Sequence, residues 1–392
     1  MLLGIKRGKN RVVSRDGVRA PHLFKLRSGE LLLTFHIDPD KHFPRRICLR
    51  SADGGCTWRK DPPRTCKEMA WGESRSGVVL AFERDTFEKK PGVFLGAHYR
   101  SDDGGKTFRG PLESVIRVDR AAGQDYPLSP EHYPEKGSVL REFYGPIPRF
   151  YRPIIARSSH RRGFNFWRYI LCDKKRWLCA MQGKFHGDVA QRSILVESRD
   201  EGRNWRFVNT ISYEHDSSID GNCEPALCRV ADGSLLCMMR RHGPAKKNMI
   251  QRRSLDNGKT WSPPETLPSH GVDPDLCLMS NGVLACAFGR PGNHLMFSPD
   301  GCGYTWGYRT EIGRWSSSAM MGMAEIKPGR LLLVYDRRID KYHGGGRNPK
   351  NCHIRALTFK VKKLRLKLAC STAAVERHCR RANFVPRACR GV

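Results

Sequence analysis

The sequence lacks several patterns that would indicate common site chemistries. Its 15 cysteines form no Cys-x-x-Cys pair, and its closest histidines, His36 and His42, are six positions apart, so zinc-site spacing is absent. No Gly-x-Ser-x-Gly nucleophile elbow occurs, and the glycine-rich stretch 341–351 lacks the Gly-Lys-Ser/Thr ending of a phosphate-binding loop. No apolar run approaches the ~18 residues of a membrane helix. We therefore expect no metal, no cofactor and no membrane span.

Acidic residues are scarce. The chain has 392 residues, with 70 Lys and Arg against 39 Asp and Glu, and a net charge of +31. Such an excess attracts nucleic acids, anionic glycans and acidic membranes without regard to sequence. The basic residues are spread along the chain, and only 360–367 forms a dense run. The net charge is the only feature that favours a nucleic-acid partner, and it is not sufficient. We therefore do not expect such a partner. Oligomeric state is left open.

Cysteine usage and the amino terminus bear on the compartment. Many cysteines stand inside apolar segments, as Cys228, Cys237, Cys277 and Cys286 do. This placement is typical of small buried thiols in a reducing compartment. The apolar stretch after Met1 is too short for a signal peptide, and charges follow at once. The sequence as written predicts a cytoplasmic protein, and secretion stays open if the amino terminus is incomplete.

One short pattern recurs along the chain: an apolar strand, a turn with Gly, and a second apolar strand. Six copies align on Leu31, Val79, Leu178, Leu235, Leu284 and Leu331. Four of the five intervals are close to 50 residues, which is the length of a four-stranded blade. The interval from Val79 to Leu178 is about twice as long.

A second motif follows five of the six copies. It begins at Ser51, Ser101, Ser198, Ser254 and Ser298, and the first example reads SADGGCTW. Ser and Asp side chains can bond the backbone amides of a turn, Gly supplies a positive φ, and the aromatic residue pins the strand register. The motif predicts a hairpin turn, and its regular phase relative to the first pattern favours one repeated architecture.

The second motif resembles the aspartate box, or BNR repeat, of the sialidase superfamily. The resemblance covers about residues 15–364. It implies an all-β fold, a six-bladed β-propeller of four-stranded antiparallel blades. We expect residues 1–364 to form this propeller, with an insertion at about 110–167 that is either a lid over a pocket or a decorated outer loop. Residues 365–392 carry neither pattern and are expected to be a basic tail.

The boxes are structural, so the resemblance implies activity only through other residues. The family holds the carboxylate of an acidic sugar with three arginines, which bind carboxylates in bidentate fashion. The matching positions are Arg19 in Val-Arg-Ala-Pro, Arg240 at the end of the fourth doublet, and Arg290 before the fifth box. Asp336 falls where the family has a glutamate that steadies the first arginine.

The resemblance also implies catalytic carboxyl groups. Glu224, which opens the Glu-Pro-Ala-Leu segment, matches the glutamate that activates the nucleophile. Asp38, in Thr-Phe-His-Ile-Asp-Pro-Asp, matches the acid/base aspartate, and Asp40 is the second candidate. An acid/base group needs a pKa near the working pH, which burial can provide. The alternative for Asp38 is an ordinary turn before Pro39.

The family's tyrosine nucleophile is missing. The family spacing leads to Met320, and neither Tyr335 nor Tyr342 matches the motif. Three explanations remain: another residue serves, water attacks with Glu224 as base, or the fold survives as a binding module. The first hypothesis is a sialidase-like glycosidase acting on a terminal acidic sugar. The second is a non-catalytic propeller that binds an acidic glycan or a protein.

Overall fold

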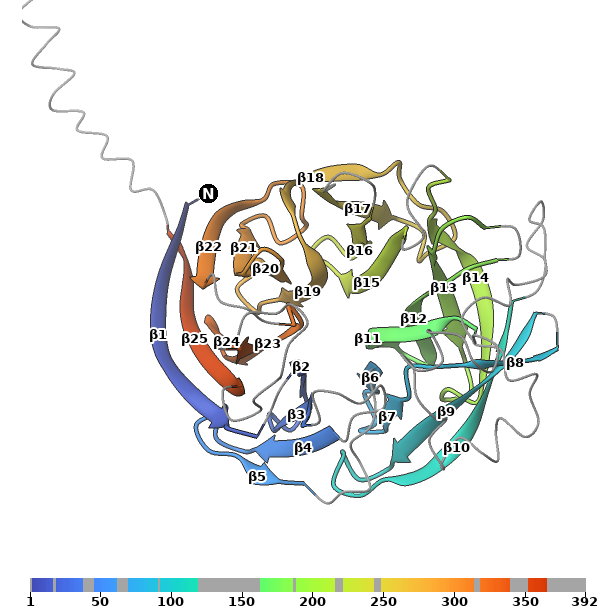
Figure 1. Cartoon of the computed structure of the whole chain (residues 1–392), viewed down its shortest axis with the longest axis horizontal. Helices are drawn as coiled ribbons and strands as arrows, with labels where there is room; N and C mark the ends of the chain where they lie inside the picture. Colours follow the sequence, from blue (N-terminus) through green and yellow to red (C-terminus); the bar gives the residue numbers. More distant parts are fainter. Residues whose placement is uncertain are drawn as a thin grey trace, which may run out of the picture.

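The computed structural model describes the chain at residues 2–16, 19–37, 46–61, 70–90, 92–118, 163–185, 188–215, 221–242, 248–313, 318–338 and 352–364. Over these ranges the regular elements are all β-strands, arranged in sheets around a central axis (Figure 1). The predicted all-β class is confirmed, and the arrangement is propeller-like. Within the described ranges, no helix is long and apolar enough to cross a membrane.

Four of the sheets have four antiparallel strands each. The first contains β2 (Arg19–Lys25), β3 (Leu31–His36), β4 (Arg46–Ser51) and β5 (Arg59–Lys60). The second contains β15 (Asn222–Arg229), β16 (Leu235–Arg241), β17 (Asn248–Ser254) and β18 (Glu265–His270). The third contains β19 (Val272–Leu278), β20 (Leu284–Gly289), β21 (Asn293–Ser298) and β22 (Gly307–Gly313).

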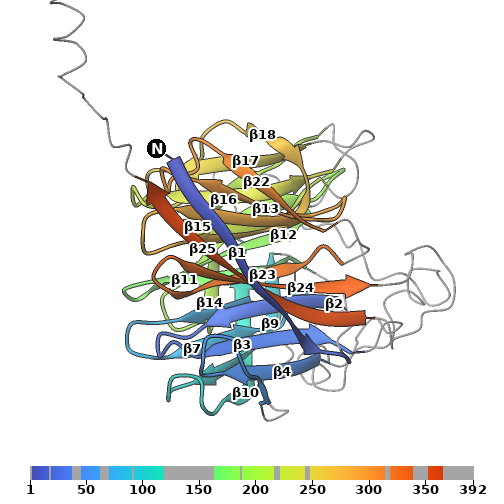
Figure 2. The same cartoon turned by 90° about the vertical axis from the view of Figure 1, so that its left-hand side faces the viewer.

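The fourth four-stranded sheet joins the two ends of the described chain. Its order is β1 (Leu2–Ser14), β25 (Cys352–Leu364), β24 (Arg330–Arg338) and β23 (Met321–Lys327). The amino-terminal β1 is its outermost strand and runs alongside β25, which is plain in Figure 2. Ladder hydrogen bonds between β1 and β25 therefore close the ring of sheets, because strands from opposite ends of the sequence share one sheet.

The remaining sheet has nine strands. They are β6 (Ala70–Glu73), β7 (Val79–Phe82), β8 (Phe87–Lys90), β9 (Val93–Ser101), β10 (Arg109–Arg117), β11 (Asn165–Asp173), β12 (Arg176–Gly183), β13 (Arg192–Ser198) and β14 (Asn204–Ser212). Two antiparallel groups, β6 to β10 and β11 to β14, are connected by short parallel pairings of β10 with β14 and of β6 with β11.

The predicted insertion at about 110–167 falls between these two groups. Its first residues lie in β10 and its last in β11, while 119–162 lie outside the described residues. The tail 365–392 also lies outside them. The insertion and the tail both stay predictions.

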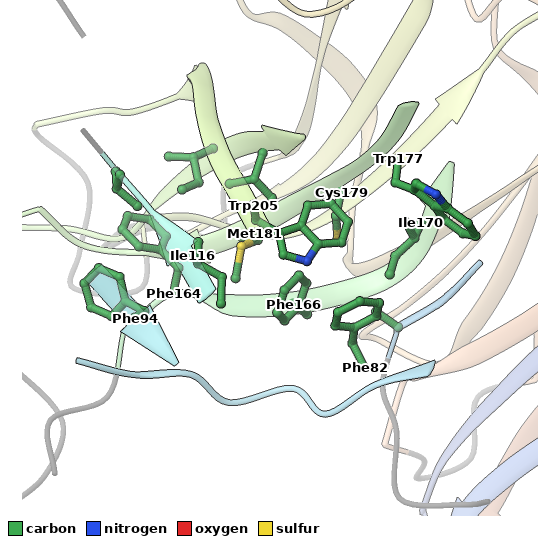
Figure 3. Close-up of a cluster of buried hydrophobic side chains, with 14 of the residues drawn as sticks. Phe82, Phe94, Ile116, Phe164, Phe166, Ile170, Trp177, Cys179, Met181 and Trp205 are labelled. Carbon is green, nitrogen blue, oxygen red and sulfur yellow. The ribbon is translucent and has the colours of Figure 1, made fainter. Parts of the chain in front are cut away.

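The two antiparallel groups pack through a large aromatic core, drawn in Figure 3. Trp205, the aromatic residue of the third box, meets Phe82 edge to face, with ring centroids 5.4 Å apart. Gly202 has a φ of +81°, and a Cβ there would lie 2.4 Å from the Phe82 ring. The box turn thus needs glycine both for its backbone conformation and for this close approach.

All five boxes form the predicted turns. In the first, Asp53 Oδ1 accepts from the backbone N–H of Cys56 and Thr57, and Asp53 Oδ2 accepts from the Thr57 hydroxyl at 2.6 Å. Ser51 Oγ accepts from Gly55 N at 2.8 Å. The other four boxes repeat this serine-to-glycine and aspartate-to-loop bonding. The boxes fix hairpins and leave the site chemistry to other residues.

Candidate functional site

The innermost strands share a backbone distortion near the propeller axis. Positive φ angles occur at Ala20, Arg168, Glu224, Asp273 and Ala319, in or just before β2, β11, β15, β19 and β23. In the first four of these strands, the pairing register slips at the same place. Bulges with left-handed residues re-aim side chains and are frequent next to functional sites. These strands surround the centre of the molecule (Figure 1), so the bulges mark an axial site.

A buried ion cluster lies at this position. Arg168 Nη2 is 2.6 Å from Asp273 Oδ2, and Arg168 Nη1 is 3.7 Å from Asp275 Oδ1. All three side chains are at most 2% exposed. Arg168 also donates to the carbonyl oxygens of Asp273 and Met321, which ties three inner strands together. One guanidinium group therefore holds two carboxyl groups away from water.

Two aromatic side chains complete the cluster. Trp167 Nε1 donates to Asp273 Oδ1 at 3.2 Å. The Tyr169 hydroxyl lies 3.3 Å from Asp275 Oδ2 and 2.8 Å from the Leu23 carbonyl oxygen. The Met323 N–H donates to Asp275 Oδ2 at 2.7 Å. Asp275 is thus held by groups from two other sheets.

Burial governs the protonation of this cluster. It raises the pKa of Asp273 to about 7 and that of Asp275 to about 6, against the opposing attraction of Arg168. Burial, followed by the nearby Arg168 charge, holds the pKa of His22 well below its usual value. One positive charge facing two carboxyl groups is neutral only when one proton is shared between them. The raised pKa values of Asp273 and Asp275 agree with a proton held on one of the two carboxyl groups.

Glu224 and Arg240 form a second, less buried pair beside the cluster. Arg240 Nη1 donates to Glu224 Oε1 at 3.1 Å, and the side chains are 15% and 14% exposed. Glu224 Oε2 accepts from the Asp273 backbone N–H at 2.7 Å. The Glu224 backbone N–H in turn donates to Gln182 Oε1. The structure thus brings two of the sequence-predicted residues together and attaches them to the axial cluster.

Asp336 lies on the other side of the axis, fully buried. Its two carboxylate oxygens accept from the Ser318 hydroxyl and backbone N–H, both at 2.7 Å. Ser318 Oγ also accepts from Ala20 N at 3.1 Å. Asp336 therefore organises the backbone at Ala20, next to Arg19, and its expected role in steadying the Arg19 side chain stays a prediction.

Arg290 is exposed and approaches the same region. Its Nη2 lies 3.4 Å from the Ser318 carbonyl oxygen. The backbone of Arg290 has a φ of +55° and its N–H donates to Gly292 O at 2.8 Å. Arg290 and Asp336 thus both contact Ser318, which precedes the inner strand β23.

Two predicted residues are described only in part or not at all. Arg19 opens β2 opposite His36 in the register, but its side chain lies outside the described residues. Asp38 lies outside them as well, together with Asp40. Their roles stay predictions.

The structure describes two residues that bear on the missing tyrosine nucleophile, Met320 and Tyr335. Met320 is half-buried and donates its backbone N–H toward Ser318 Oγ at 3.3 Å. Tyr335 is buried, and its hydroxyl bonds Asn10 of the outermost strand β1. Tyr335 is therefore directed away from the axis, and Tyr342 lies outside the described residues. In the described part of the chain, no group of three or more His, Cys, Asp and Glu could hold a metal ion.

Sequence reasoning missed Arg168, Asp273 and Asp275. A signal was present for Asp273, because it precedes Pro274 at the start of a doublet as Glu224 precedes Pro225. Chemically, the arrangement offers a carboxylate of low exposure at Glu224, a neighbouring guanidinium group, and a buried cluster that holds the backbone beside them. Such a set can bind an acidic sugar and take a proton from water.

The sequence model of the BNR repeat-like domain family matches residues 165–371. No curated protein sequence matches the chain significantly. Among solved structures, a protein of unknown function from Dyadobacter fermentans is similar with a TM-score of 0.67 and 16% identity, covering 92% of this chain and 100% of that one. An α-L-arabinanase of Penicillium chrysogenum is similar with a TM-score of 0.59 and 13% sequence identity, covering 90% of this chain and 98% of that one. The NanB sialidase of Streptococcus pneumoniae is similar with a TM-score of 0.53 and 14% sequence identity, covering 92% of this chain and 70% of that one. At these identities the likeness concerns the fold, which is glycoside-hydrolase-like.

Proposed function

The chain belongs to the BNR repeat-like family of the sialidase-like superfamily, and we propose that it is a glycoside hydrolase acting on a terminal acidic sugar such as sialic acid. The observation that supports this most is the Glu224–Arg240 pair, which stands at the axis with each side chain about 15% exposed. The guanidinium group of Arg240 would bind the carboxylate of the sugar. Arg19 and Arg290 would complete the clamp.

We propose six blades for the fold. The two antiparallel groups of the nine-stranded sheet would each form one blade, and the four four-stranded sheets would form the others. The support is that each group contains one copy of the apolar doublet followed by one box, as single blades do elsewhere in the chain. On this count, β8 is an addition to the second blade.

The reaction follows from the absence of a matching tyrosine. Glu224 would take a proton from a water molecule, whose oxygen attacks the anomeric carbon as the glycosidic C–O bond breaks. Asp38 would donate a proton to the departing oxygen. Direct attack by water inverts the anomeric configuration. The buried Asp273 does not touch solvent and would position Glu224 through its backbone N–H.

Hydrolysis of a fluorogenic sialoside tests this proposal. We expect Glu224→Gln to lower kcat about a thousandfold, because it removes the general base while keeping the shape of the side chain. NMR of the first-formed sugar should show the inverted anomer. Turnover of the parent protein no higher than that of an Arg19→Ala, Arg240→Ala double variant would refute the activity.

The second candidate function is a non-catalytic propeller that binds an acidic glycan or a protein. Met320, at the position of the family's nucleophile, favours it. Saturable sialic-acid binding in calorimetry without hydrolysis would support it. If Met320→Tyr then created turnover, loss of the nucleophile would explain the inactivity, whereas continued inactivity would require a further defect.

A further inference from the structure

A pocket lies at the seam where the ring of sheets closes. It has a volume of about 500 Å³, within the range of roughly 300–1,000 Å³ typical of small-ligand sites. Residues of β1, β24 and β25 line one side, and the first box loop, at 53–56, lines the other. Seven of its lining residues are basic: Lys6, Arg7, Lys9, Arg11, Lys327, Arg330 and Lys360. We call this pocket the seam groove.

Three of these cations stand in one row across three strands. Lys6 lies directly opposite Lys360, and Lys360 lies directly opposite Arg330. Directly opposed residues share a face of the sheet, and like charges there destabilise it. Within the described part of the chain, none of the three forms an ion pair with a carboxylate. The three positive charges of this row are therefore not balanced by a carboxylate, and a bound anion would stabilise them.

A β-bulge gathers a fourth cation onto this face. Arg7 pairs with Phe359 and Asn10 with Leu357, so Gly8 and Lys9 together oppose Thr358. Without the extra residue, Arg11 would face away from Lys6, since side chains alternate along a strand. With it, Arg11 lies opposite Ala356, on the same face as Lys6. A Cβ at Gly8 would lie 2.4 Å from Thr358 Oγ1, so glycine permits the bulge.

The opposite wall is fixed to this face. Arg11 Nη1 donates to the Cys56 carbonyl oxygen at 3.3 Å, and a Cβ at Gly55 would lie 2.6 Å from Leu332. Asp53 also lines the groove, but its carboxylate is held by the amides and hydroxyl of its own loop. Ile326 is partly exposed between the cationic walls, and Leu332 and Ala356 are buried beneath it.

We propose that the seam groove binds a sulfated oligosaccharide. The partly exposed Ile326 suits the nonpolar face of a sugar ring, and the guanidinium groups of Arg11 and Arg330 suit sulfate, which they can bind in bidentate fashion. Single-stranded nucleic acid fits less well, because its bases need exposed aromatic platforms. Among the described residues that line the groove, Phe359 is the one aromatic residue, and it is 1% exposed.

The groove is distinct from the axial site. Arg330 begins β24 at the groove, and Asp336 lies six residues later on the same strand, near the axis. At about 3.3 Å per residue, this separates the two by roughly 20 Å. The seam groove is independent of the proposed hydrolysis, and its failure would leave that proposal untouched.

Calorimetry with a sulfated tetrasaccharide and its desulfated counterpart tests the inference. The triple variant Lys6→Gln, Lys360→Gln, Arg330→Gln should lose about tenfold or more in affinity for the sulfated sugar, since three charge-assisted contacts disappear together. A matched control, Lys106→Gln, Lys175→Gln, Lys259→Gln, removes three exposed cations from turns elsewhere in the ring and should bind as the parent does.

Three results would overturn the inference: equal losses in the two triple variants, equal binding of the desulfated sugar, or equally tight binding of a single-stranded oligonucleotide of the same charge. Thermal melting provides a second readout. The seam variant should melt at or above the parent temperature, because the like-charge row is relieved. If its fold is nevertheless lost, Arg330→Gln alone takes its place, with an expected loss of several-fold in affinity.

Discussion

Asp300 in the fifth box and Asp273 at the axis belong to the same sheet but have opposite environments. Asp300 accepts hydrogen bonds from its own loop, from Cys302 N, Gly303 N and the Thr305 hydroxyl. Although partial burial opposes them, bonds from Thr305 and Ser298 lower the pKa of Asp300 to about 2. Asp273 is buried, and its pKa is raised to about 7.

The difference lies in where the partners come from. The partners of Asp300 stand within five residues, so the turn can form and satisfy its charge locally. Those of Asp273 include Trp167 and Arg168, more than 100 residues away. The charge of the box carboxylate is thus stabilised by hydrogen bonds within its own turn. The axial carboxyl groups find their partners only when the ring of sheets has assembled. Three predictions test this contrast.

The largest effect is expected from Arg168→Met. The change leaves Asp273 and Asp275 buried without their cation, and breaking a buried ion pair typically costs about 3–5 kcal/mol of unfolding free energy. Urea unfolding at pH 7 measures it. Arg176→Met, which removes a partly exposed pair with Glu197, should cost about 1 kcal/mol or less.

Adding Asp273→Asn and Asp275→Asn to Arg168→Met should recover part of the loss, because no uncompensated carboxylate then remains. Equal destabilisation by Arg168→Met and Arg176→Met would show that the axial cluster is not an essential ion cluster, and the contrast with the boxes would fail.

The boxes were predictable from sequence for a physical reason. Ser, Asp, Gly and Thr act within one short loop, so the whole interaction is written in eight or nine consecutive letters. The all-β class followed from the same repeats. Glu224 and Arg240 were predicted from the family resemblance, and the structure pairs them directly.

The axial cluster was not predictable in the same way. Arg168 follows directly after the segment assigned to an insertion and precedes the doublet copy aligned on Leu178, and its partners come from β19 and β23. Only the assembled ring brings these strands together. The proline after Asp273 repeats the pattern at Glu224, and comparing repeats position by position would have identified Asp273 as an axial residue.

The second prediction concerns pH. Because the pKa values of Asp273 and Asp275 are raised above about 4 in the folded state, the folded protein binds more protons than the unfolded chain between pH 4 and 7. Unfolding free energy from this cluster therefore falls as pH rises through that window, by up to about 1.4 kcal/mol for each unit by which a carboxyl pKa is raised. Urea unfolding of the parent and of Asp275→Asn at pH 5 and pH 8 measures it. The variant should lose the smaller part of the dependence, because Asp273 keeps the larger shift, and an unchanged slope would contradict the assignment.

The smallest effect is expected at a box, and it has the opposite sign in pH. Asp300→Ala should cost about 1 kcal/mol at pH 7, because several loop hydrogen bonds are lost from a largely solvated group. The pKa of Asp300 is lowered to about 2 in the folded state, so this contribution is present above pH 4 and disappears as pH falls toward 2. The difference in unfolding free energy between parent and variant should therefore shrink between pH 5 and pH 3. Asp173→Ala, at an exposed position paired with Arg229, is the control and should change stability little at either pH. If the difference in unfolding free energy between parent and Asp300→Ala grew on acidification, the local hydrogen bonds would not stabilise the charge of Asp300. Box and axial carboxyl groups would then not differ in the sign of their pH dependence.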